Sequence, residues 1–193
     1  MYIPTREVLT DALLALLQEH TMDQITVKMV CQQAGVSRQA LYNHYYCLMD
    51  VFEALCTREM DAAVSGCDDY HRWAEGFRSI LTYFAQRKTV FLHIYRSSSR
   101  EDLLRIIERY GARLVERGIG QCAADRNLPI TERDRRFMVH TYLYMFMGMV
   151  DSYFSDGMRE TPAYIASRCE AMMAFSIRAA LRRLQKLKTT NDA

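Results

Sequence analysis

The stretch AGVSRQALYNHYY, residues 34–46, decides the fold of this chain. Gly35 can end one helix, and Ser37 can cap the next, because a serine hydroxyl satisfies free amide groups at a helix start. After Ser37, the residues Leu41 and Tyr45 fall on one side, and side chains that form hydrogen bonds fall on the other. The stretch therefore predicts two short helices joined at Gly35, the second with an apolar inner face.

The flanking segments extend this pair into a three-helix group. Residues 5–19 repeat apolar side chains at three- and four-residue spacing, which is typical of an amphipathic helix. Thr26 can cap a second helix that ends at Gly35. This order of elements, a helix, a glycine turn and a capped helix, is that of a helix-turn-helix, a motif whose second helix enters the DNA major groove. Residues 1–50 are therefore predicted to be a DNA-binding domain.

The outer face of the predicted third helix has the side chains that bind DNA. Arginine pairs with guanine, glutamine and asparagine pair with adenine, and a tyrosine hydroxyl can hold a phosphate. Residues 1–52 carry three cations and five acidic residues, which alone argues mildly against nucleic acid. No acidic residue lies between Asp23 and Asp50, however. A solvated helix face is the alternative, and the acid-free window together with the Gly35 turn favours DNA.

The stretch ITVKMVCQQAGVSRQALYNHYYCLMDVFEAL, residues 25–55, resembles the DNA-binding region of the TetR family of bacterial transcription regulators. The likeness spans residues 5–55 and includes the threonine that opens the second helix, the AGVS turn, the LY pair and the aromatic residue three positions after that tyrosine. In that family Thr26 and Tyr42 would bind phosphates, and Lys28 would reach DNA from the second helix. The resemblance implies DNA contacts at Thr26, Lys28, Ser37, Arg38, Gln39, Tyr42, Asn43 and His44.

Two residues depart from the family pattern. Leu48 stands where members usually have a lysine that touches the DNA backbone, so we expect weaker DNA binding. Gln39 stands where a small residue is common, and the Arg38–Gln39 pair resembles a subset that includes regulators of dihydroxyacetone kinase operons. That subset suggests a variant of the function, an activator that responds to a protein partner.

The rest of the chain, residues 51–193, is predicted to be a larger helical domain, which gives an all-α protein of about nine helices. The expected helices span residues 49–67, 69–88, about 100–118, 131–154 and 162–187. The last two should pack antiparallel because their connection is short. The resemblance implies that this pair forms a four-helix dimer interface, and the last helix supplies a compatible apolar stripe: Ile165, Cys169, Met173, Ile177, Leu181 and Leu184.

The larger domain is also the expected place for an effector. It is rich in aromatic and methionine residues, and the run YMFMGMV, residues 144–150, suits either core packing or the plastic wall of a pocket. Such rings suit an apolar or aromatic small molecule. The candidate lining residues are Tyr83, Phe84, Phe91, His93, Tyr110, His140 and Tyr144.

Other functional classes find little support in the sequence. The six cysteines are scattered, no signal-peptide pattern is seen, and no apolar run is long enough to span a membrane, so a cytoplasmic protein with reduced thiols is expected. Neither a metal-ligand spacing nor a catalytic or nucleotide-binding motif is present, so no enzyme, metal site or cofactor is predicted. A thiol-based redox or metal sensor stays an alternative.

These observations predict a homodimeric transcription regulator that binds a palindromic double-stranded DNA operator and acts as a repressor released by a small-molecule effector. The alternative is an activator or adaptor controlled by a protein partner, with weak or vestigial DNA binding. Leu48 and the net charge of the first 52 residues favour that alternative.

Overall fold

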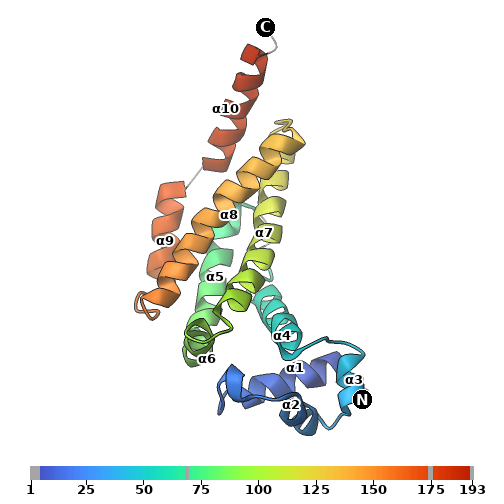
Figure 1. Ribbon diagram of the computed structural model, residues 1–193. Coiled ribbons are helices and arrows are strands. Elements are labelled where there is room, and N and C mark those ends of the chain that lie inside the picture. The colour runs from blue at the N-terminus through green and yellow to red at the C-terminus, as the bar shows by residue number, and fades with distance from the viewer. Residues whose placement is uncertain (1–4, 68–69, 174–175, 192–193) are drawn as a thin grey trace. The chain divides into compact units, whose positions relative to one another are not determined.

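The computed structural model describes residues 5–67, 70–173 and 176–191, and within these ranges the chain is helical with no β-strand (Figure 1). This confirms the predicted all-α fold. The α-helices are α1 (Thr5–Leu16), α2 (Val27–Ala34), α3 (Arg38–Tyr42), α4 (Leu48–Ala63), α5 (Trp73–Gln86), α6 (Lys88–Tyr95), α7 (Arg100–Asp125), α8 (Glu132–Ser155), α9 (Pro162–Met173) and α10 (Ser176–Asn191). Two 3₁₀ turns, η1 (Met22–Gln24) and η2 (Tyr70–Arg72), precede α2 and α5.

The chain forms two compact units. The first unit comprises residues 1–62 and 86–106, and the second comprises residues 63–85 and 107–193. The first unit therefore holds not only the predicted helix-turn-helix but also α6 and the beginning of α7. The sequence placed a domain boundary after residue 50, and that functional division stays a prediction.

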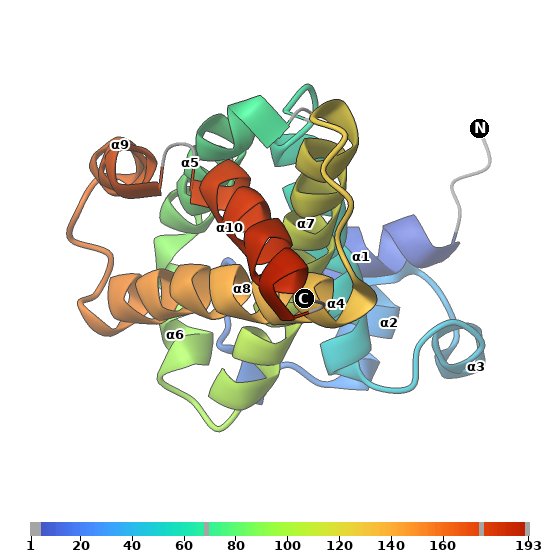
Figure 2. The ribbon, with the colours of Figure 1, turned by 90° about the horizontal axis from the view of Figure 1, so that it is seen from above.

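In the first unit, α1, α2 and α3 form a three-helix group around a small apolar core. Leu9 and Leu13 on α1, Val30 on α2 and Leu41 on α3 are completely buried, and Tyr45 just after α3 is nearly so. Their spacing along each helix puts these side chains on one face, which is the reason the three helices pack together. In Figures 1 and 2, α1 and α2 lie to one side of α3, so the opposite side of α3 is open.

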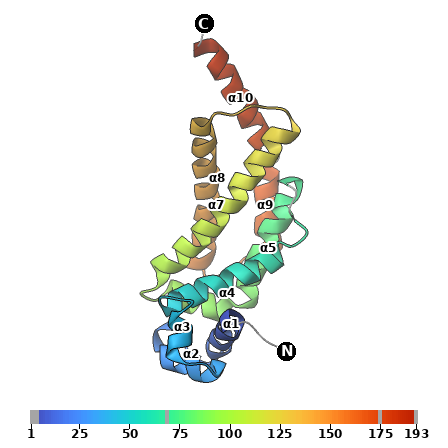
Figure 3. The same cartoon turned by 90° about the vertical axis from the view of Figure 1, so that its right-hand side faces the viewer.

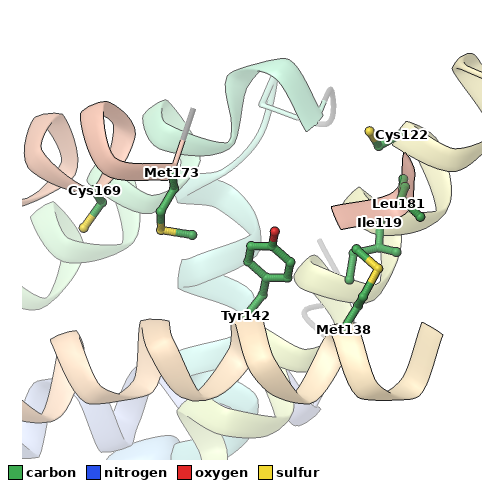
Figure 4. Packing of buried hydrophobic residues seen from close by; sticks show 7 residues of the cluster. All are labelled: Ile119, Cys122, Met138, Tyr142, Cys169, Met173 and Leu181. Atoms are coloured by element: carbon green, nitrogen blue, oxygen red, sulfur yellow. The ribbon is translucent and has the colours of Figure 1, made fainter. Parts of the chain in front are cut away.

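In the second unit, the long helices α7 and α8 run beside each other, as Figures 1 and 3 show. Its core cluster draws residues from α7, α8, α9 and α10 (Figure 4). The buried members are Ile119, Cys122, Met138, Tyr142, Cys169, Met173 and Leu181. Most of the larger helical domain expected from the sequence, residues 51–193, falls in this unit, whereas residues 51–62 and 86–106 fall in the first.

The helix expected from residue 131 begins there, because Thr131 caps α8 and its hydroxyl accepts the amide of Asp134 at 3.1 Å. The last predicted helix falls on α9 and α10, and residues 174–175 between them lie outside the described residues. Helix α6 was not among the expected helices, because its eight residues have no side-chain cap and no clear apolar periodicity.

Within the described ranges, no helix is both long enough and apolar enough to span a membrane.

Candidate nucleic-acid interface

Local caps fix the turn between α2 and α3. The Thr26 hydroxyl accepts the amide of Met29 at 3.3 Å, and the Ser37 hydroxyl accepts the amide of Ala40 at 3.1 Å. Between them Gly35 adopts a left-handed conformation with φ of 66°. The amide of Val36 then reaches the carbonyl of Cys31 at 3.0 Å, which closes a Schellman motif. The chain therefore leaves α2 and enters α3 along one defined path.

The eight candidate DNA contacts all lie on exposed positions of this helix-turn-helix. Leu41 and Tyr45 turn into the core, whereas Arg38, Gln39 and Tyr42 are exposed; Tyr42 has 53% of its surface free. This arrangement presents one polar surface, the reading face: Thr26, Lys28, Ser37, Arg38, Gln39, Tyr42, Asn43 and His44. Whether these residues touch DNA stays a prediction.

Two features of the reading face affect how it would meet DNA. The side-chain amide of Gln39 donates to the Asn43 carbonyl oxygen at 3.1 Å, so the two amide side chains hold one another in place. Lys28 and Arg38 make no ion pair with the described residues. Their charges are therefore not neutralised within this part of the chain and can meet phosphates or base edges.

Two neighbours of the reading face, Tyr46 and Asp50, lie outside the predicted set of DNA contacts. Tyr46 has 92% of its surface exposed, and the carboxylate of Asp50 accepts the amides of Tyr46 and Cys47 at 2.8 and 3.1 Å. Asp50 thereby fixes the loop from α3 to α4. The signal was available, because an acidic residue in the first turn of a helix commonly caps it. Leu48, at the usual lysine position, is half-buried as the first residue of α4.

Family models match both parts of the chain. One described as "Bacterial regulatory proteins, tetR family" matches residues 9–46, and one described as "Transcriptional regulator C-terminal region" matches residues 71–174. The second match alone covers more than half of the chain. The chain belongs to the TetR family of bacterial transcription regulators. Membership in this family makes it a transcription regulator with a DNA-binding domain and not an enzyme.

Solved structures of other TetR-type regulators share the fold. The dihydroxyacetone kinase operon activator DhaS aligns with a TM-score of 0.63 at 15% identity over 92% of this chain and 98% of its own. The TetR family repressor AlkX from Dietzia sp. strain DQ12-45-1b, implicated in biodegradation of n-alkanes, aligns with a TM-score of 0.57 at 20% identity over 93% and 98%. A transcriptional regulator from Pseudomonas aeruginosa PAO1 aligns with a TM-score of 0.58 at 20% identity over 92% of each chain. No curated protein matches the chain.

The candidate effector residues have different environments. Tyr83, Phe84, Phe91 and Tyr110 are buried, whereas His93, His140 and Tyr144 are exposed. His140 and Tyr144 stack with ring centroids 6.0 Å apart, and the Tyr144 hydroxyl donates to Glu108, which raises the pKa of Tyr144. Phe91 and His93 belong to the first unit and the other five to the second.

The apolar stripe of α9 and α10 packs inside its own subunit. Cys169, Met173 and Leu181 are buried in the core cluster, and Ile165, Ile177 and Leu184 pack against it. The stripe is therefore shielded from water within its own subunit. Its role in a dimer stays a prediction.

An open cavity of about 350 Å³ lies beside this stripe, between the C-terminal half of α8 and the beginning of α9. Met145, Met149 and Ile165 form its apolar wall, and Asp156, Arg159 and Glu160 contribute charges. None of the seven candidate effector residues lines it. In the described part of the chain no group of three or more His, Cys, Asp or Glu side chains is arranged to share a metal ion.

Proposed function

We propose that this TetR-family protein binds a palindromic DNA operator as a homodimer, represses transcription there, and is released when a small-molecule effector binds its second unit. The observation that carries the proposal is the reading face, whose eight polar side chains are exposed together around a buried apolar core.

Roles on the reading face follow from side-chain chemistry. Arg38 and the Gln39–Asn43 pair are placed to read base edges, because a guanidinium and side-chain amides match guanine and adenine in the major groove. Thr26 and Tyr42 have hydroxyls that suit phosphate oxygens, and Lys28 suits phosphate through its charge. The hydroxyl of Ser37 and the imidazole of His44 complete the set at the two ends of α3.

A dimer is proposed on geometric grounds. Each subunit carries one α3, and two half-sites of an operator lie one helical turn, about 34–36 Å, apart, so two subunits are needed to read both. Large apolar side chains stay exposed on α8 and α9: Phe137, Tyr144, Tyr164 and Met172. We infer that these residues join Ile165, Cys169, Met173, Ile177, Leu181 and Leu184 in the dimer-forming pair of helices.

The effector is proposed to enter the second unit, with an apolar or aromatic body. Tyr83, Phe84, Tyr110, His140 and Tyr144 all belong to that unit. An effector that binds one conformation more tightly shifts the population toward it, by no more than its differential affinity. A regulator of chromosomal operators would work in the bacterial cytoplasm.

The test is footprinting of genomic fragments that flank the protein's own gene, with binding measured at about 50 and 200 mM salt. We expect a protected palindrome and an affinity for it at least a hundredfold above that for random DNA, falling steeply with salt. Arg38→Ala should require a higher protein concentration for the same protection, and Arg96→Ala, which removes the same charge from an exposed position outside the reading face, should leave the footprint unchanged. Failure of the wild-type protein to prefer any fragment would contradict the proposal.

The alternative, a regulator controlled by a protein partner with weak DNA binding, is favoured by Leu48. Leu48→Lys separates the two, because a new phosphate contact steepens the dependence of log affinity on log salt by about one unit. If the wild type already binds its operator tightly, Leu48→Lys should protect the same palindrome and change repression little. If only Leu48→Lys gives a footprint while a co-purifying protein controls transcription, the partner-controlled alternative holds.

A further inference from the structure

Sulfur atoms from two helices of the second unit meet beside the open cavity between α8 and α9. The thiol of Cys169 on α9 donates to the thioether of Met149 on α8, with the two sulfur atoms 2.8 Å apart. Nonbonded carbon atoms pack at roughly 3.5–4.0 Å, and sulfur is the larger atom. The two sulfurs are therefore directed at one another and not simply packed against hydrocarbon.

Two methionines extend this pair along both helices. Met145 lies one turn before Met149 on α8, and both side chains line the cavity. Met173 lies one turn after Cys169 on α9, and both are buried in the core cluster against which Met145 and Met149 pack. Figure 4 shows the sulfur atoms of Cys169 and Met173 on the side of α9 that faces α8. We call this group the sulfur cluster: Met145, Met149, Cys169 and Met173.

The chemistry of the sulfur cluster suits one class of ligand. A thiolate and thioethers are soft ligands, the set that selects Cu(I) among the metals that proteins bind, whereas Zn²⁺ is held by Cys, His and carboxylate side chains. In the described ranges no three His, Cys, Asp or Glu side chains are arranged to share an ion, so the ligands of a zinc site are not gathered here. Core packing explains buried methionines in general, but not a thiol aimed at a thioether beside open space.

The cavity gives an ion access to the sulfur cluster. Its volume is about 350 Å³, and two of its three charged lining residues, Asp156 and Glu160, are acidic. The C-terminal end of α8 adds a partial negative charge to the same region, so the cavity favours cations over anions.

The cavity also gives the ligands room to adjust. Sulfurs that share an ion through bonds of about 2.3 Å stand farther apart than the 2.8 Å between Cys169 and Met149. Met149 must therefore move back when an ion enters. Its flexible side chain can do so, because it borders the open space of the cavity.

We propose that the sulfur cluster binds one soft monovalent metal ion of the Cu(I) class, held by the Cys169 thiolate and the thioethers of Met149 and Met145, with Met173 on the buried side. The ion replaces the thiol proton: a sulfur–metal bond forms as the S–H bond breaks, the proton passes to solvent, and no electron is transferred. The sulfur cluster shares no residue with the candidate effector set. The inference therefore goes beyond the proposed function and holds with or without an operator.

The binding test titrates Cu(I), without oxygen, into the full chain in competition with a chromogenic Cu(I) chelator. Cys47 and Cys67 are not buried and would also bind copper, so the doubly substituted protein Cys47→Ser/Cys67→Ser serves as the parent. We expect the parent to bind one Cu(I) per chain and to prefer it to Zn²⁺. X-ray absorption of the complex should show sulfur as the only kind of ligand.

Substitutions in the parent locate the site. Cys169→Ser should lower the Cu(I) affinity at least about a hundredfold, and Met149→Leu, which nearly conserves volume, about tenfold or more. Cys122→Ser and Met138→Leu remove a thiol and a thioether from elsewhere in the same core cluster, and each should change the affinity less than about twofold. Figure 4 shows Met138 beside Ile119, away from Cys169.

Circular dichroism checks that each variant is folded. If Cys169→Ser does not fold, Met149→Leu and Met145→Leu decide the question, because leucine fits the space of methionine without its sulfur. The proposal is overturned if the parent does not bind Cu(I), binds Zn²⁺ equally well, shows oxygen or nitrogen ligands, or keeps its affinity in both methionine variants. Because the titration contains no DNA, such a failure leaves the proposed function standing.

Discussion

At the scale of single residues, the reading face separates side chains that read bases from those that only position the protein. Arg38→Ala and Gln39→Ala should each cost about 1–3 kcal/mol on the operator and little on random DNA, if these residues touch base edges. Lys28→Ala should weaken binding to both DNAs almost equally, because a phosphate contact carries no sequence information. Fluorescence anisotropy titrations on both DNAs measure this. Equal losses for all three variants would remove the assignment of α3 as the reading helix.

Because Gln39 and Asn43 are joined by a hydrogen bond, their effects on affinity should not add. Removing either partner already frees the other side chain, so the second substitution costs less.

Gly35 is the other residue whose role is decided locally. Its φ of 66° disfavours any side chain, and a Cβ added there would meet nothing within 4 Å. Gly35→Ala should therefore lower the free energy of unfolding by about 1 kcal/mol through backbone strain alone. Gly120, inside α7 with ordinary backbone angles and equally open space, is the matched control, and Gly120→Ala should raise stability by about 0.5–1 kcal/mol. Urea unfolding curves that move in the same direction for both variants would contradict this.

At the scale of helices, α1 is tied to α4 by Arg58. Its guanidinium pairs with Asp11 at 2.8 Å and donates to the buried Thr10 hydroxyl at 2.9 Å. Glu59, next along α4, pairs with Arg87 at the beginning of α6 at 2.5 Å. This chain of contacts joins α1, α4 and α6 within the first unit, so these helices should shift together.

The strength of the Asp11–Arg58 pair can be measured by a double-mutant cycle of Asp11→Asn and Arg58→Gln. Both side chains are more than a third exposed, so we expect a coupling of only about 0.2–1 kcal/mol that falls as salt rises. Arg58→Gln alone should cost more than the coupling, because it also leaves Thr10 without its donor. A coupling insensitive to salt would mean that the pair is better shielded from water than its exposure indicates.

At the scale of the whole molecule, the proposed dimer should depend on exposed rather than buried apolar residues. Phe137 and Met172 are 68% and 80% exposed, so Phe137→Glu and Met172→Glu should leave the subunit folded and yield a monomer with weak operator binding. Light scattering after size-exclusion chromatography, with circular dichroism to confirm folding, tests this. Leu181→Glu should instead unfold the second unit, because Leu181 is 1% exposed in its core. A dimer that survives both exposed substitutions would place the interface elsewhere.

The sequence by itself determined the features that depend on neighbours along the chain. Caps at Thr26, Ser37 and Thr131, the left-handed Gly35 and the split of α3 into an apolar and a polar side all follow from local hydrogen bonding and helical periodicity, and the structure contains each of them. The family resemblance rested on the same local pattern.

Only the tertiary structure decided which apolar faces are shielded and which polar groups meet. Leu181 and Phe137 both look apolar in sequence, yet one is buried and the other exposed, because burial depends on which helices pack against each residue. Thr10 and Arg58 are separated by 48 positions along the chain, and the packing of α1 and α4 brings them into hydrogen-bond contact. Periodicity identifies a face of a helix, but the partner of that face is chosen by the packing of the whole unit.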